Sequence, residues 1–363
     1  MDMGSVGSEK GDVNMKKRLL VLLLAMALLV GTACSRQKGQ SEKEDTEAPC
    51  DHVYTETETR GIFADKQVIH VCTKCGDTYT ETTEPATKSL KILAIGNSFN
   101  NNSSSLLYDL ASDGGAEDIV IGCLWIGGST LQDHAFQIKQ NAPKYEYRKN
   151  SNGTWNVTQW RTFLEGLQDE KWDFIVLNQG SIVAGQPDQA AEGLDTVVSC
   201  IRENANPGSE LWFNMTWAYD ADSTSNPNFA AWYNSDPQTM YEAVRDTSRN
   251  VIMGSGYFDG LIPCGTTMQN LRTSWAANQV TQDGHHASNG FGCYALGLTW
   301  LATLTDIDVS SIQWFPKLYS KWGTEYEDAL RDIAKEAVIH AVEKPYEVTQ
   351  SSYTEKPEFQ ANR

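Results

Sequence analysis

The sequence predicts an α/β protein in two parts: a small cysteine-containing module, then one large domain built on a parallel sheet. From residue 90 to residue 343, short apolar runs alternate with segments of helical periodicity. Strands of this kind, separated by helices, are typical of a parallel sheet that is covered on both faces. Ahead of them, residues 50–83 contain three cysteines between two polar linkers, and a length of 363 residues is enough for one large domain and one small one.

The first 34 residues are predicted to direct export rather than to fold. Basic residues at 16–18 precede an apolar run at 19–30, and small residues lead to Cys34. The run is shorter than the roughly 20 residues that a membrane span requires, so it is typical of a signal peptide. Ala33-Cys34 resembles a bacterial lipobox. We therefore expect a cell-surface lipoprotein whose membrane contact is a lipid anchor at Cys34; cleavage followed by secretion is the alternative.

Residues 50–83 carry the motifs Cys50-x-His52 and Cys72-x-x-Cys75-Gly. Together these four side chains can form a closed, structural zinc site, and so small a module needs a metal because its own core is too small. The stretch also resembles the short zinc-ribbon modules of exported Gram-positive bacterial proteins. The alternative is a disulfide from Cys50 to Cys72 or Cys75, which leaves one cysteine over. His70 is expected at the surface.

The remaining boundaries follow from composition. Residues 35–49 are dense in charge and have no aliphatic or aromatic side chain larger than alanine, which predicts a flexible linker. A second short linker lies at 84–89, the large domain is placed at 88–345, and residues 346–363 are expected to form a loosely attached tail.

The elements of the large domain alternate along the chain. Two alternating runs around Asn152-Gly153 predict a hairpin at 145–160. Four further cysteines lie in or beside apolar segments and are expected to be buried free thiols: Cys123, Cys200, Cys264 and Cys293. Strands are expected at 90–95, 118–125, 172–178, 210–216 and 260–265, with helices near 103–113, 188–204, 237–254, 290–304 and 325–343.

The overall charge limits the partners. The formal net charge is −18 at pH 7, which argues against nucleic acid or an anionic membrane surface as a binding partner.

Ser98 directly follows the first strand and precedes a helix. Open α/β sheets bind ligands at the carboxyl ends of their strands, and a backbone N–H at a helix start faces such a ligand. Gly96 permits a tight exit from the strand. Ser98 is therefore either a helix cap or a nucleophile, and the second interpretation requires a base, an orienting acid and donors for an oxyanion.

The segment "TQDGHHAS" offers the base and the acid. Asp283 lies three residues before His286 in a polar turn that precedes a helix. One loop can then carry both groups, with Asp283 accepting a hydrogen bond from the imidazole and fixing its tautomer. A capping aspartate beside two exposed histidines is the alternative interpretation.

Donors for an oxyanion follow the next two strands. Gly127-Gly128 can present a backbone N–H, and Asn178 or Gln179 can add a side-chain amide. The joint occurrence of these elements with the serine and the histidine favours an acyl-transfer site that needs no cofactor.

Together, Gly96-Asn97-Ser98, the glycines after strand two, the amide after strand three and Asp283-x-x-His286 resemble the SGNH (GDSL-type) hydrolase superfamily over residues 90 to about 305. The stretches "GNSF", "GGSTLQDH", "WDFIVLNQGS" and "DGHHAS" are similar to a branch found largely in gut bacteria, whose members look like polysaccharide-processing esterases.

The resemblance implies a flavodoxin-like three-layer fold, with Ser98 and His286 catalytic and Asp283 assisting them. It also implies an oxyanion hole from N–H groups of Ser98 and Gly127 or Gly128, with an amide after strand three. Two positions depart from the usual pattern: Asn97 replaces the commoner Asp, and "LNQGS" replaces Gly-x-Asn-Asp. The third donor therefore stays open between Asn178 and Gln179.

The expected function is an exported serine esterase that removes acetyl or other acyl groups from carbohydrate. A lipase or thioesterase is one alternative, but no strongly apolar insert is present to form a lid. A non-catalytic glycan-binding lipoprotein is another, although a binder has no need of the full triad. His134 is expected either to contact the substrate or to pack inside the protein. Arg272 is expected either to bind an anionic group or to form an ion pair. Three aromatic residues at strand ends are expected to stack on sugar rings or to lie in the core: Trp125, Trp217 and Tyr219.

Overall fold

The computed structural model describes residues 50–59, 61–317 and 324–358. They form two compact units that divide between Thr87 and Lys88, within the second predicted linker. The predicted signal segment, Cys34 and the linker at 35–49 lie outside the described residues. Among the helices of the described part, none is long and apolar enough to cross a membrane.

The first unit is a three-stranded antiparallel sheet in the order β1-β2-β3, formed by β1 (Tyr54–Glu58), β2 (Lys66–Cys72) and β3 (Thr78–Glu84). Every residue of β3 is exposed, so apolar burial contributes little to holding this sheet together. His70, expected at the surface, is instead buried in the central strand, where its ring stacks on Tyr79 at 4.2 Å between centroids. The flanking strands cover it, which the sequence alone does not reveal.

The second unit contains a seven-stranded sheet in the order β10-β9-β8-β4-β5-β6-β7. Five strands are parallel, and the β6–β7 hairpin is added antiparallel to β5, as the turn signal predicts. The predicted fold class is confirmed. The strands are β4 (Ser89–Gly96), β5 (Asp118–Trp125), β6 (Tyr145–Asn150), β7 (Trp155–Arg161), β8 (Phe174–Leu177), β9 (Glu210–Asn214) and β10 (Gly260–Ile262).

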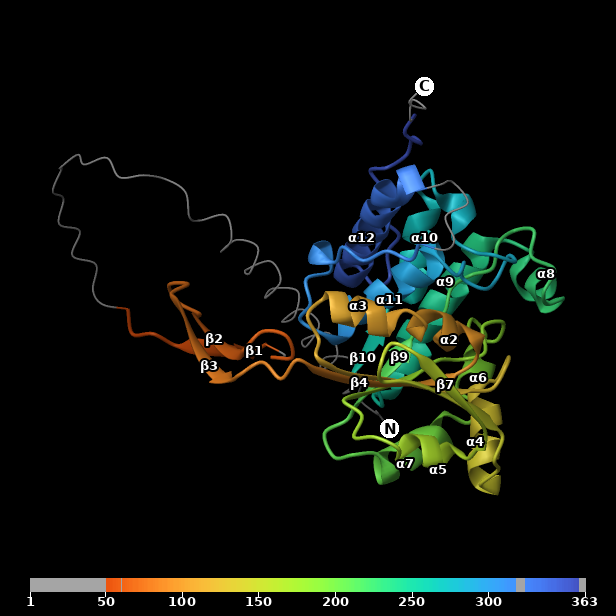
Figure 1. Cartoon of the computed structure of the whole chain (residues 1–363), viewed down its shortest axis with the longest axis horizontal. Coiled ribbons are helices and arrows are strands. Elements are labelled where there is room, and N and C mark those ends of the chain that lie inside the picture. Colours follow the sequence, from red (N-terminus) through yellow and green to blue (C-terminus); the bar gives the residue numbers. More distant parts are fainter. Residues whose placement is uncertain (1–49, 60, 318–323, 359–363) are drawn as a thin grey trace, which may run out of the picture. The chain divides into compact units, whose positions relative to one another are not determined.

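Helices cover both faces of this sheet (Figure 1). One layer contains α4 (Leu131–Gln140), α5 (Phe163–Leu167) and α7 (Leu194–Asn204); the other contains α2 (Ser98–Ser104), α3 (Leu107–Asp113), α10 (Cys264–Arg272), α11 (Phe291–Leu304) and α12 (Glu327–Glu343). Both faces of the central strands are therefore buried, which explains their continuous apolar runs. Three shorter or outer helices complete the unit: α6 (Pro187–Ala190), α8 (Asn228–Tyr233) and α9 (Pro237–Thr247).

Several boundaries differ from the sequence prediction by a few residues, and two of the differences can be traced to particular residues. The strand expected at 260–265 ends at Ile262, because Pro263 lacks a backbone N–H and Cys264 already begins α10. The segment after residue 345 is not loose over its described part. The N–H groups of Thr349 and Ser351 donate to the side chains of Asn270 and Thr273, at 2.8 Å each.

The four predicted core cysteines are buried and unpaired. Each lies in or beside a strand or helix that packs into the second unit: Cys123 in β5, Cys200 in α7, Cys264 in α10 and Cys293 in α11.

Candidate active site

Ser98 is the first residue of α2, two residues after the end of β4. Asn97 caps this helix, since its side-chain oxygen accepts the N–H of Phe99 at 3.0 Å. The N–H of Ser98 belongs to the first helical turn and donates no hydrogen bond within the described residues. Ser98 is partly exposed, while its neighbours Asn97 and Phe99 are buried. The helix start thus presents both the hydroxyl and the backbone N–H of one serine.

His286 and Asp283 lie in the loop before α11, and the structure brings both to Ser98. The Oγ of Ser98 is 2.9 Å from His286 Nε2, and His286 Nδ1 is 2.7 Å from Asp283 Oδ2. Asp283 Oδ1 also accepts the backbone N–H groups of His285 and His286, at 3.2 Å and 2.8 Å. Burial opposes the charge on Asp283, but these donors outweigh it and lower the pKa of the carboxyl group below its ordinary value. Asp283 is therefore held ionised as the partner of one imidazole nitrogen.

His285 lies beside this set without sharing its geometry. Its ring centroid is 3.9 Å from that of His286, and its Nδ1 is 3.1 Å from Asp283 Oδ1 without forming a well-directed hydrogen bond. Burial and the neighbouring His286 lower the pKa of His285. Of the two adjacent histidines, His286 is the one that faces Ser98.

Residues from the β9 side hold the histidine loop. Trp217 donates its indole N–H to the carbonyl of His285 at 2.8 Å, and its ring stacks on Phe99 at 4.1 Å between centroids. The N–H of Asp220 donates to the carbonyl of Gly284 at 2.7 Å. Trp217 therefore touches the nucleophile's helix and the base's loop at once. The sequence offered no signal for this role beyond an aromatic residue at a strand end.

Arg272 forms the ion pair that was one of its two predicted roles. Its guanidinium donates to Asp220 Oδ1 at 2.7 Å and to the carbonyl of Ala218 at 2.8 Å. The other oxygen of Asp220 accepts the hydroxyl of Thr281, at the start of the histidine loop. This half-buried pair fixes the segment that supports His286.

The candidate oxyanion donors separate into two groups. Gly127 and Gly128 form an exposed turn after β5, and neither N–H donates a hydrogen bond to another described residue. Together with the N–H of Ser98, these are backbone donors that the fold leaves unused.

The side-chain amides of Asn178 and Gln179, by contrast, are already used within the protein, so the expectation that one of them is the third donor is not supported. Asn178 is fully buried and donates to Asn97 Oδ1 at 2.9 Å and to the carbonyl of Gln179 at 3.2 Å. Gln179 donates to the carbonyls of Ala190 and Gln189, at 2.9 Å and 3.4 Å.

The glycine before the nucleophile is explained by the same packing. A Cβ at Gly96 would lie 1.8 Å from Asn178 Oδ1, so only glycine allows this close approach.

Asn97, which the sequence marked only as a departure from the family pattern, connects the start of α2 to the segments that follow β5 and β8. Its amide donates to the carbonyls of Ser129 and Gln179, at 2.9 Å and 3.2 Å.

His134 is not available to a substrate. It is fully buried in α4, with Nε2 3.0 Å from Ser129 Oγ and Nδ1 2.8 Å from the hydroxyl of Tyr145. The packing role is therefore the correct one. Burial disfavours the charged ring and lowers the pKa of His134 to about 4.

Acid should consequently destabilise the fold through His134. Between its ordinary pKa of about 6.5 and its folded value, the unfolded chain binds a proton that the native chain does not, so stability falls as pH falls through this window and levels off below it. From pH 7 to pH 4.5 we expect the free energy of unfolding to fall by about 2–3 kcal/mol more in the wild type than in His134→Gln. Urea unfolding at the two pH values measures this difference, and equal losses in both proteins would contradict it.

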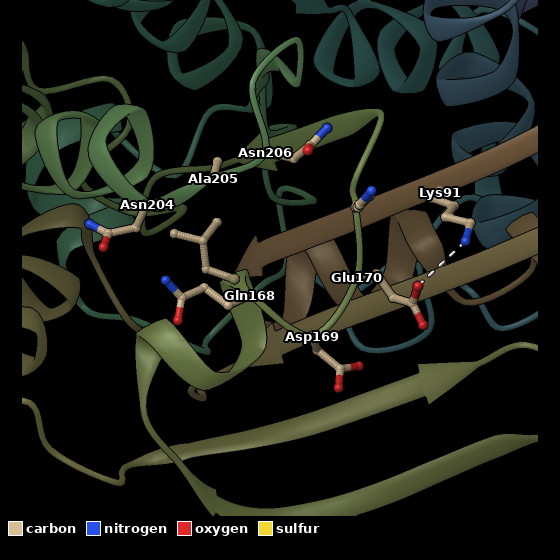
Figure 2. A pocket seen from close by; sticks show the side chains of 9 residues that line it. Lys91, Gln168, Asp169, Glu170, Asn204, Ala205 and Asn206 are labelled. Atoms are coloured by element: carbon tan, nitrogen blue, oxygen red, sulfur yellow. Dashed lines mark hydrogen bonds and ion pairs between the residues drawn. The ribbon is translucent and has the colours of Figure 1, made fainter.

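A hollow of about 600 Å³ lies away from these residues (Figure 2). Lys91 lines it from the amino-terminal part of β4, whereas Ser98 follows the carboxyl end of that strand. Lys91 is ion-paired with Glu170 at 3.4 Å, as the dashed line in the figure marks. The hollow contains none of the predicted site residues.

In the first unit, the four predicted metal ligands come together. One ligand atom from each of Cys50, His52, Cys72 and Cys75 lies within 4.8 Å of the others. The Sγ atoms of Cys50 and Cys72 are 4.0 Å apart as free thiols, and Cys75 Sγ is 3.4 Å from His52 Nδ1. Burial would raise the pKa of Cys72, but hydrogen bonds from the backbone N–H groups of Cys75 and Lys74 help to lower it to about 5. Such a thiolate, with its N–H donors, suits a tetrahedral metal.

Fold and site together define the class of protein. A mostly parallel sheet lies between two helical layers, a serine follows its first parallel strand, and an Asp-x-x-His loop late in the chain reaches that serine. This is the arrangement that the resemblance to the SGNH hydrolase superfamily implies.

The chain belongs to the DUF4886 family, described as a domain of unknown function, whose profile matches residues 91–335. A DUF4886 family protein of known structure from Bacteroides uniformis ATCC 8492 is 30% identical, with a TM-score of 0.67 over 74% of this chain and 100% of that one.

More distant likenesses were also found. A protein from Slackia heliotrinireducens proposed to be an SGNH hydrolase is 18% identical (TM-score 0.40, 60% of this chain, 99% of that one). The acetylxylan esterase Axe2 from Geobacillus stearothermophilus is 12% identical (TM-score 0.37, 59% and 94%). At these values neither likeness says what this chain acts on. Among curated proteins, none matches.

Proposed function

We propose that this chain is a serine ester hydrolase that removes acyl groups, acetyl above all, from carbohydrate. The observation that carries the proposal is the unbroken series Ser98 Oγ, His286 and Asp283, joined at 2.9 Å and 2.7 Å. A surface serine that only capped its helix would have no need of a histidine with a dedicated carboxylate. These contacts favour a nucleophile.

The geometry supports the following cycle. His286 Nε2 takes the proton of Ser98 as Oγ attacks the ester carbonyl, while Asp283 holds the ring and stabilises its charged form. The backbone N–H groups of Ser98 and of the Gly127-Gly128 turn donate hydrogen bonds to the oxyanion of the tetrahedral intermediate and stabilise its negative charge. His286 then protonates the leaving alcohol, and water repeats the sequence on the acyl-enzyme, releasing the acid. No cofactor takes part in this cycle.

The carbohydrate part of the proposal rests on the surroundings of the site. The β6–β7 hairpin at the edge of the sheet is mostly polar on its outer strand, where Asn156, Thr158 and Gln159 are exposed beside Val157 and Trp160. A lipase or long-chain thioesterase would need an apolar surface for its acyl chain.

A substrate screen tests the proposal. Purified protein and Ser98→Ala are compared on 4-nitrophenyl esters from acetate to dodecanoate and on partially acetylated xylo-, manno- and cello-oligosaccharides. The proposal requires turnover of short acyl esters and saccharide acetates by the wild type alone. Preference for dodecanoate would favour the lipase alternative, and wild-type activity in Ser98→Ala would remove Ser98 as nucleophile.

We further propose that Cys50, His52, Cys72 and Cys75 hold one structural zinc ion. Their four ligand atoms converge in a unit that has little apolar core, and thiolate and imidazole are the ligands that zinc prefers in closed sites. The metal would staple the first unit and would take no part in ester cleavage.

Export as a lipoprotein remains a proposal that rests on the sequence of residues 1–34. If Cys34 is lipidated, the protein expressed in a bacterial host should partition into the detergent phase of a Triton X-114 extraction. Cys34→Ala should then appear in the aqueous phase. Recovery of both forms in the aqueous phase would indicate ordinary secretion.

A further inference from the structure

One residue of the second unit combines two unfavourable features. Trp160, near the end of β7, is 70% exposed and has a φ of +63°, a left-handed conformation that is rare for a large side chain. An exposed indole gains little burial from the fold, and a left-handed backbone is strained for a large side chain.

A β-bulge produces this conformation. Tyr145 pairs with Arg161 and Tyr147 pairs with Thr158, so Gln159 and Trp160 together lie opposite Glu146. Bulges of this kind redirect a side chain and are common beside active sites. The hairpin therefore turns an indole outward at one defined point.

The register places that point in line with the nucleophile. Gly96 pairs with Trp125 and Trp125 pairs with Glu146, so one row crosses four neighbouring strands from β4 to the bulge in β7. It starts two residues before Ser98 and ends at the free edge of the sheet. Three inter-strand spacings make it roughly 14 Å long.

Polar side chains form a continuous chain above this row. Arg148 donates to Asn101 Oδ1 of α2 at 2.6 Å and to Glu146, and Gln159 donates to the second carboxylate oxygen of Glu146 at 2.6 Å. The Arg148 guanidinium lies 4.7 Å from the centre of the partly exposed Trp125 ring. Between Ser98 and Trp160 the surface thus offers two indole rings and planar donors and acceptors held in fixed positions.

We propose that this row, from Trp125 to Trp160, binds the sugar units of a neutral oligosaccharide next to the one whose ester is cleaved; it rests on the proposed function of the site. Indole faces pack against the C–H faces of sugar rings, and guanidinium, carboxylate and amide groups bind hydroxyl pairs. Arg148 balances Glu146, and the net charge of −18 disfavours a polyanion. The polar neighbours of Trp160 do not suit a lipid.

The test compares long and short substrates. On the acetylated hexasaccharide that the screen finds to be turned over, Trp160→Ala should lower kcat/KM about ten-fold through KM, and Trp160→Phe should lose less. On the matching acetylated monosaccharide the loss should be much smaller, so the ratio of the two kcat/KM values falls. Tyr257→Ala, which removes another exposed aromatic ring just before β10 at the far edge of the sheet, should keep the wild-type ratio.

Binding provides a readout that does not depend on turnover. Calorimetry with the unacetylated hexasaccharide should detect binding to Ser98→Ala and a weaker signal when Trp160→Ala is added. The proposal would be overturned if Trp160→Ala changed neither the ratio of the two kcat/KM values nor the binding of the hexasaccharide. It would also be overturned if Trp160→Ala changed the oligomeric state, because Trp160 would then contact another protein chain. If no ester is turned over, the proposed function fails, and calorimetry still decides whether the row binds sugar.

Discussion

Replacing Ser98 or His286 by alanine is expected to lower kcat by about 10⁴-fold or more, and replacing both is expected to cost little beyond that. The reason is that the two groups act as one unit. Without His286 Nε2 at 2.9 Å, the hydroxyl of Ser98 keeps its proton at neutral pH; without Ser98, the imidazole has no nucleophile to activate. Steady-state rates on 4-nitrophenyl acetate, with the free-energy effects of the single and double variants compared, measure this non-additivity.

Two further variants make this prediction specific. Asp283→Asn should cost less than His286→Ala, because it disturbs the orientation of the ring and leaves both reacting groups in place. His285→Ala is the matched control, since its ring is adjacent to His286 but does not face Ser98. A loss of turnover in His285→Ala together with activity in His286→Ala would show that the base has been assigned to the wrong histidine.

Removal of metal is expected to unfold the first unit. Structural zinc sites of this ligand type supply about 10–16 kcal/mol of apparent binding free energy at pH 7, and a module of this size has no comparable apolar core. Elemental analysis should find about one zinc per chain. Chelation should abolish the hydrogen-exchange protection of β1, β2 and β3, while the second unit keeps its own unfolding transition.

Cysteine variants provide the control for this prediction. Cys72→Ser should lose the zinc, because Cys72 is one of the four converging ligands. Cys200→Ser, which changes a cysteine on α7 of the second unit, should retain it. Metal-free protein whose Cys50 is found in a disulfide-linked peptide would exclude the zinc site.

Much of the fold could be predicted because its signals are local. Residues 118–125 form a strand with the predicted bounds, since their apolar run is buried on both faces. Helices α4 and α8 were not predicted: α4 has a capping box at Thr130 and Asp133, yet its segment is polar enough to resemble a loop. The start of α10 was predicted as part of a strand, because the apolar residues around Pro263 are compatible with a strand or a helix.

The site divides in the same way. Ser98, Asp283 and His286 could be found because each stands in a short motif at a recognisable place. That the amides of Asn178 and Gln179 are already hydrogen-bonded could not be predicted. The acceptor of the Asn178 amide, for example, is Asn97, which lies 81 residues away in the sequence. The bulge at Trp160 depends on the pairing of two strands, and no local pattern marks it.

Ser98 and His286 meet although 188 residues separate them in the sequence. A chain made from its amino end contains the hydroxyl long before it contains the imidazole, and a serine without a base is a poor nucleophile. An unfinished or incompletely folded chain is therefore chemically inert toward esters in the cell that makes it. The pairing of distant strands is also a slow stage of folding. The recovery of esterase activity during refolding would accordingly report the meeting of two residues that lie 188 positions apart, well after the first helices have formed.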